Sequence, residues 1–162
     1  MTEKDAILYS LESTKAFVPM YLKDFSDADL LVRVTPTANH IAWQLGHLIS
    51  SEVSLVKSDL PALRYPDLPA GFAEQHGKKT TGSDTGFLPV SEYLTLFEKV
   101  REGTMTIVRI LPEDELNRPS EGPLAPLAPT IGTLFLTLAH HTLMHAGQFT
   151  VVRRALGKPV LF

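Results

Sequence analysis

The stretch TIGTLFLTLAHHTLMHAGQFTVVRRAL, residues 130–156, decides the fold, because it is the longest segment of the chain with the pattern of a helix. Gly157 and Pro159 follow it and provide a stop signal. Arg153 and Arg154 lie in its last turn, where the helix dipole favours positive charge. Its longest apolar run, residues 131–139, is far shorter than the roughly 20 residues that span a bilayer.

Three earlier segments also have the pattern of helices with one apolar face, at about residues 3–24, 36–57 and 90–111. Pro19 should kink the first helix or end it early. Thr35 as N-cap and Pro36 at the first helical position should start the second. No segment shows the two-residue alternation of a strand. The sequence therefore predicts an all-α fold, an antiparallel four-helix bundle with a long loop between helices 2 and 3.

That long loop covers about residues 58–88 and is unusual for a bundle. Loops of this length often act as functional lids or contain a short helix, for which residues 68–76 are the candidate. His76 lies in this loop and is expected to be exposed.

Composition narrows the classes of function. A chain of 162 residues fits a single domain, here residues 1–162, with a core that needs no disulfides. The net charge of −3 argues against partners such as nucleic acid or an anionic membrane. The start of the chain lacks a signal peptide pattern, which predicts a cytoplasmic location. Cysteine is absent, so any metal must be held by His, Asp or Glu.

The six histidines carry most of the functional information. His141 and His145 are four residues apart, so they project from one face of a helix and can bind one ion. His47, among apolar residues of the second helix, is a third candidate ligand from across the core, and His40 on the same stripe is its rival. Three imidazoles would leave a coordination position open, as in catalytic zinc sites. The alternative is that these histidines merely pack in the core.

The residues on either side of His141 bear on the kind of metal site. His140 points away from His145 and is interpreted as a packing or supporting residue. Thr142 follows His141 where a zinc metalloprotease of the H-E-x-x-H type has its catalytic glutamate, so that class is excluded.

Two segments resemble the DinB-like superfamily: NHIAWQLGHL (residues 39–48), and HTLMHAGQ (141–148) followed by RRALG (153–157). The resemblance covers nearly the whole chain. It implies a four-helix bundle, often a homodimer, with a divalent metal ion held by His47, His141 and His145. Characterised relatives include thiol S-transferases and a mycothiol-dependent maleylpyruvate isomerase. Relatives often carry an acidic residue where this chain has Thr142, so the surroundings of the metal should differ.

Four residues near the expected ligands have proposed supporting roles. Gln148 shares the face of His141 and His145 and could orient a ligand or substrate, or form an interhelical hydrogen bond. Trp43, one turn before His47, is interpreted as core or as wall of the substrate pocket. Gly46 and Gly147 should allow close approach of the second and fourth helices, because glycine inside a helix otherwise costs about 1 kcal/mol.

The leading hypothesis is a metal-dependent transferase or hydrolase that uses the three-histidine site to activate a small-molecule thiol or water. The thiol would be a low-molecular-weight cosubstrate, since the chain has no cysteine. Zinc or nickel is the expected divalent metal ion, with iron or manganese as alternatives. The competing hypothesis is a non-catalytic, metal-binding or stress-related dimeric module. The sequence identifies no catalytic residue beyond the ligands.

Overall fold

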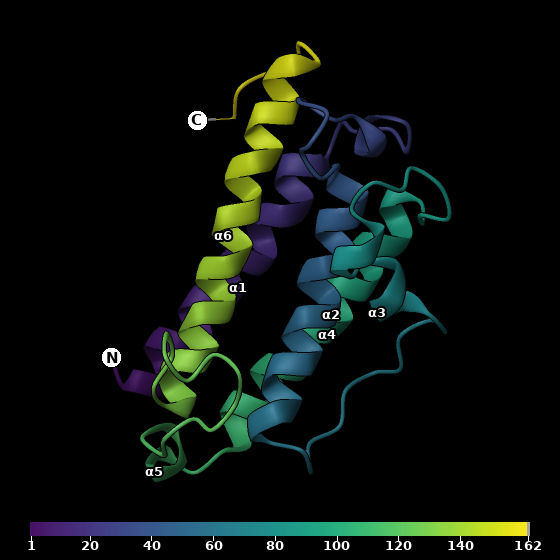
Figure 1. Ribbon diagram of the computed structural model, residues 1–162. Helices are drawn as coiled ribbons and strands as arrows, with labels where there is room; N and C mark the ends of the chain where they lie inside the picture. Colours follow the sequence, from purple (N-terminus) through teal and green to yellow (C-terminus); the bar gives the residue numbers. More distant parts are fainter. Residues whose placement is uncertain (162) are drawn as a thin grey trace.

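The computed structural model describes residues 1–161 and consists of helices (Figure 1). The four long helices are α1 (Glu3–Leu22), α2 (Ile41–Asp59), α4 (Val90–Ile110) and α6 (Ile131–Ala155). Short helical turns lie between them: η1 (Asp29–Leu31), α3 (Phe72–Gln75), η2 (Lys78–Thr80) and α5 (Glu113–Leu116). The described residues contain no β-strand, only an isolated bridge between Pro119 and Thr130. The predicted all-α four-helix bundle is confirmed.

The long helices form a ring in which α1 and α2 each contact both α4 and α6. Two pairs are antiparallel, α1 with α4 and α2 with α6, whereas α1 runs parallel to α6 and α2 runs parallel to α4 (Figure 1). Hydrogen bonds at the ends agree: Lys4 near the start of α1 binds the carbonyl of Leu111 after α4, at 2.6 Å. A chain that leaves α2 must therefore return along the bundle before α4 begins. This return requires the long loop that the sequence predicted.

The core consists of the apolar faces of the four helices. In α1, Ile7, Leu11 and Val18 are fully buried. Pro19 neither breaks nor shortens this helix, which continues to Leu22, so the predicted early end is wrong. None of the helices within residues 1–161 is both long and apolar enough to cross a membrane.

A buried ion pair joins all four helices at the centre of this core. Arg101 in α4 has no solvent exposure and binds the carboxylate of Glu52 in α2, with Nη2 to Oε2 at 2.8 Å. Its guanidinium also donates to the carbonyl of Leu11 and the hydroxyl of Thr14 in α1, and to the hydroxyl of Thr142 in α6. Buried charges are tolerated when they are paired and hydrogen-bonded in this way, and here the pair links all four helices at one level of the bundle.

The start of α2 differs from the prediction. The helix begins at Ile41, and its N-cap is His40, whose Nδ1 accepts a hydrogen bond from the backbone of Trp43 at 3.1 Å. Thr35 instead closes a turn, accepting a bond from the backbone of Ala38. The imidazole replaces the expected threonine cap because its ring nitrogen reaches the free amide of the first turn. With Nε2 held 2.9 Å from the carbonyl of Ser83, His40 is a structural residue.

Two long connections pack beside α2, one running along the bundle and the other lying at one of its ends (Figure 1). The first, residues 60–89, contains α3, a shorter version of the helix predicted at 68–76. The second, residues 111–130, is fixed to the end of α2 by Asp59, whose carboxylate accepts bonds from Ser120, Glu121 and Gly122.

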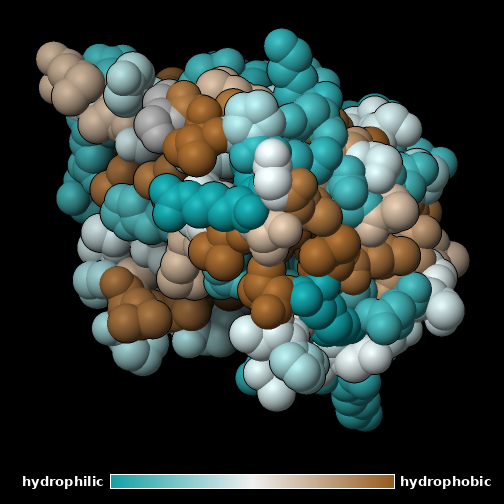
Figure 2. All heavy atoms as spheres, turned by 90° about the horizontal axis from the view of Figure 1, so that it is seen from above, coloured by the Kyte–Doolittle hydropathy of each residue, from teal (hydrophilic) through white to brown (hydrophobic). Residues whose placement is uncertain are grey.

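Seen from above, apolar side chains lie among hydrophilic ones at one end of the bundle (Figure 2). Val34, in the connection after η1, and Val160, after α6, are 37% and 55% exposed. Arg153 near the end of α6 is hydrogen-bonded to Asp24 and to the carbonyl of Tyr21, which ties the ends of α1 and α6 together.

Candidate metal centre

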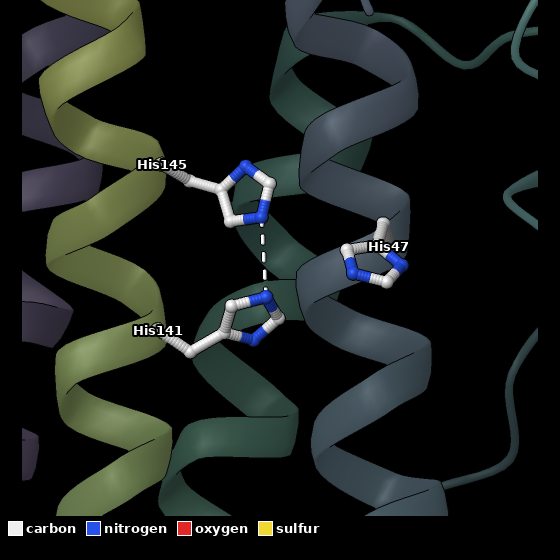
Figure 3. A group of neighbouring side chains, drawn as sticks. All are labelled: His47, His141 and His145. Atoms are coloured by element: carbon white, nitrogen blue, oxygen red, sulfur yellow. Dashed lines mark hydrogen bonds between the residues drawn. The ribbon is translucent and has the colours of Figure 1, made fainter.

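Three histidines meet where α2 and α6 face each other (Figure 3). His47 projects from α2, and His141 and His145 project from successive turns of α6. One nitrogen from each ring lies within 4.8 Å of the others. The antiparallel packing of α2 against α6 therefore brings His47 to two residues that are almost 100 positions away in the sequence. The spacing had predicted the shared face of His141 and His145, and His47 was one of two candidates for the third position.

The geometry of this cluster suits a metal ion. Nε2 of His141 and Nε2 of His145 are 3.2 Å apart. Two nitrogens that both bind one tetrahedral zinc ion at about 2.0–2.1 Å lie about 3.3 Å from each other. A cluster of three imidazoles is also a donor set that zinc, nickel, copper and iron accept.

Gln44 sets the orientation of one ring. Its amide nitrogen donates to the carbonyl of Asn39 at 2.7 Å, so its Oε1 is the acceptor for His145, 2.8 Å from Nδ1. Nδ1 of His145 therefore carries the proton, and the lone pair of Nε2 points toward His141. Metal-binding histidines are commonly held by such a hydrogen bond on the other ring nitrogen. Gln44 was not among the residues predicted from the sequence. Its signal was its position three residues before His47, on the α2 face turned toward α6.

All three rings are neutral at pH 7. Burial is the main cause that lowers the pKa of His141 to about 4 and that of His145 to about 3, and the neighbouring histidines lower both further. Burial also lowers the pKa of His47, with a smaller contribution from the positive charge of Lys78. Neutral imidazoles have the free lone pairs that a metal ion requires.

His47 is held in place by its own helix. The indole of Trp43 stacks on its ring, with centroids 4.9 Å apart and planes at 10°, and Ser51 lies 3.3 Å from its Nδ1. Trp43 is itself anchored by its Nε1, which donates to the carbonyl of Gly77 in the long loop. Trp43 is thus a buried support of a candidate ligand, while a contact with substrate stays a prediction.

A cleft of about 410 Å³ opens beside the histidines. Its apolar lining consists of Leu55, Leu124, Leu127, Leu138 and Met144. The remaining lining residues are Ser51, Thr137, His47, His140 and His141. The volume lies within the range of small-molecule sites, and two candidate ligands form part of its wall.

The other residues proposed from the sequence lie elsewhere. Gln148 is exposed and does not line the cleft, so its supporting role stays a prediction. His140 is exposed and lines the cleft. His40 faces Ser83 rather than the cluster. The expected exposure of His76 is wrong: it is 2% exposed, and Tyr93 and the carbonyl of Phe72 each lie 2.7 Å from one of its ring nitrogens.

The two glycines do not serve the predicted close approach of helices. A Cβ on Gly46 would lie 2.0 Å from the ring of His76, so this glycine makes room for the long loop. A Cβ on Gly147 would meet nothing within 4 Å. The ring of His76 therefore fills a notch in α2 directly beside His47.

Behind His141 lies the buried ion pair. Thr142 is 1% exposed, accepts a hydrogen bond from Arg101 at 2.8 Å and donates to the carbonyl of Leu138. Glu52 and Arg101 lie close enough to act on the pKa of His141 in opposite directions. The sequence analysis missed this pair, because a single Glu and a single Arg on different helices give no local pattern.

Comparison with known proteins agrees with this fold. The family model described as the DinB superfamily matches residues 10–149. A solved structure of YfiT from Bacillus subtilis, described as a probable metal-dependent hydrolase with an unusual four-helix bundle topology, is similar with a TM-score of 0.69 and 16% identity. The similarity covers 96% of this chain and 89% of YfiT. A conserved protein from Enterococcus faecalis gives a TM-score of 0.70 at 15% identity, covering 98% of this chain and 99% of the other. No curated protein matches the sequence.

Proposed function

Because the chain belongs to the DinB superfamily, we propose that it is a metal-dependent enzyme that promotes attack of a nucleophile on a small molecule. The nucleophile is water or a low-molecular-weight thiol. His47, His141 and His145 would hold the divalent metal ion, and the cleft beside them would hold the substrate. YfiT, which has the same fold, is described as a probable metal-dependent hydrolase.

The observation that carries the proposal is a cluster of three neutral imidazoles, two of which, His47 and His141, form part of the wall of an open cleft. A non-catalytic metal-binding module would be expected to close its site with a fourth side chain. Within residues 1–161, the cluster consists of only three potential ligands. Three protein ligands and an accessible fourth position are typical of catalytic zinc sites.

In the proposed reaction the metal ion would activate the nucleophile, and the side chains of the protein would position the ligands and the substrate. A bound divalent cation lowers the pKa of a water or thiol ligand, so that a nucleophile is available near neutral pH. Gln44 and Trp43 hold the rings of His145 and His47, which limits the reorganisation needed on binding. The apolar wall of the cleft displaces water from the reacting atoms. The proposed ion is zinc or nickel, both of which accept imidazole ligands, and iron or manganese are the alternatives.

Metal content tests the proposal that the three histidines hold a metal ion. Protein reconstituted with zinc, nickel or manganese and then desalted should retain about one ion per chain, measured by inductively coupled plasma mass spectrometry. His145→Ala should lose it, because two of the three donors do not hold an ion against desalting. His140→Ala is the matched control, since it removes an exposed histidine outside the cluster. Equal metal content in the wild type and His145→Ala would refute the site.

Turnover tests the proposal that the protein is an enzyme. The loaded protein should be assayed on small esters and on alkyl halide electrophiles, each with and without added thiol. Turnover in water alone identifies a hydrolase, and turnover that requires thiol identifies a transferase. If neither class is converted by a protein that holds its metal, the enzymatic proposal fails.

A further inference from the structure

We propose that the substrate of this site carries an uncharged, apolar chain, which lies in the cleft between α2, α6 and the connection 111–130 while its reacting end faces the histidines. This inference rests on the proposed function, since it names the substrate class of the same site. It is drawn from the lining of the cleft.

The first argument is the chemistry of the wall. Five of the lining residues are apolar, and they come from all three segments: Leu55 from α2, Leu138 and Met144 from α6, and Leu124 and Leu127 from the connection. Met144 and Leu127 are 62% and 77% exposed. Single large apolar side chains scattered over a surface are common in soluble proteins. Here they gather around a cavity, which is typical of a ligand site.

The second argument is the absence of charge. Among residues 1–161, those that line the cleft include no Asp, Glu, Lys or Arg, and their only titratable side chains are those of His47, His140 and His141. An ionised group on the substrate would lose hydration without finding a partner there. The cleft therefore selects against a charged chain while the metal ion can still bind a polar reacting group.

The third argument is that the outer wall is already formed. Asp59 fixes the connection through three hydrogen bonds, and two backbone bonds, Ser120 to Pro129 and Ile131 to Arg118, close its base. Leu124 itself accepts backbone bonds from Leu127 and Ala128, both at 2.8 Å. Because this wall is ordered before the ligand binds, the free energy of binding is not reduced by the entropy lost in ordering it.

A series of straight-chain hydroxamic acids, from acetohydroxamic to octanohydroxamic acid, tests the inference by calorimetry on the zinc-loaded protein. The hydroxamate group binds the metal in every member, so the series isolates the chain. The affinity should rise about fourfold for each methylene that enters the cleft. Replacing the terminal methyl by a carboxylate should weaken binding roughly tenfold or more.

Two variants of adjacent residues locate the chain. Met144→Gln should reduce the gain per methylene, whereas Leu143→Gln should not, because Leu143 is also exposed on α6 but does not line the cleft. Glutamine suits a helix at both positions. The outcomes separate the two proposals. Protein that holds zinc but binds all members of the series equally well overturns this inference alone. Protein that retains none of zinc, nickel and manganese overturns the proposed function, and this inference with it.

Discussion

Replacing Arg101 by methionine should destabilise the protein by about 3–5 kcal/mol, the cost of leaving a buried charge without its partner. Arg101 is fully buried and its carboxylate partner Glu52 is 3% exposed. The other acceptors of Arg101 keep alternative bonds within their own helices. The loss of stability therefore comes mainly from Glu52. Of its hydrogen bonds, this carboxylate would keep only the one donated by the hydroxyl of Thr104, at 2.6 Å.

The free energy of unfolding from urea titrations measures this effect. Domains of this kind are stable by about 5–15 kcal/mol, so the variant should unfold at a much lower urea concentration. Arg109→Met on the same helix is the matched control. Its side chain is 49% exposed and 3.8 Å from Glu102, so its loss should cost no more than about 1 kcal/mol.

A double variant distinguishes an unpaired charge from lost packing. Adding Glu52→Gln to Arg101→Met removes the charge that was left behind, so the double variant should be more stable than Arg101→Met alone. If Arg101→Met costs less than about 1 kcal/mol, or if the double variant is no better than the single one, the ion pair is not what holds the centre of the bundle.

Two further predictions concern the notch beside His47 and the end of the bundle. Gly46→Ala should destabilise the protein by about 1–3 kcal/mol, because the new methyl group would overlap His76, whereas Gly147→Ala should stabilise it by about 0.5–1 kcal/mol. Thermal unfolding of both variants checks this, and equal effects would contradict it. The hydrogen bonds of Arg153 hold the pKa of Asp24 below its ordinary value of 3.8. The ionised carboxylate therefore stabilises the fold at pH values above 3.8, and this stabilisation is lost as the pH falls through the lowered pKa. Asp24→Asn should therefore lower the melting temperature near pH 7, with a gap to wild type that closes in acid; a gap independent of pH would refute the role of the pair.

The helices and the shared face of His141 and His145 could be predicted because both depend on local periodicity. Residues 130–156 define a helix by pattern alone, and the spacing of His141 and His145 places them on one face. Whether His47 or His40 joins them was left open by the local pattern, and the structure brings His47 to the pair. The family resemblance pointed to the same three residues.

What could not be predicted depends on contacts between segments far apart in sequence. His76 was expected to be exposed because it lies in a loop, yet this loop packs its imidazole against Gly46. Thr35 had the better N-cap signal, but His40 begins α2. Local propensity cannot decide such cases, because the competing partner comes from another part of the fold.

The order of helix directions explains why these distant contacts gather near the candidate site. Since α2 runs parallel to α4, and α6 returns beside α2, both long connections must pass α2 (Figure 1). The first presses His76 into the notch at Gly46 and anchors Trp43, which stacks on His47. The second places Leu124 and Leu127 over the cleft. The helices thus supply the candidate ligands and part of the cleft wall, and the connections supply the rest. Variation in the connections can therefore change the lining of the cleft while the histidines stay in place.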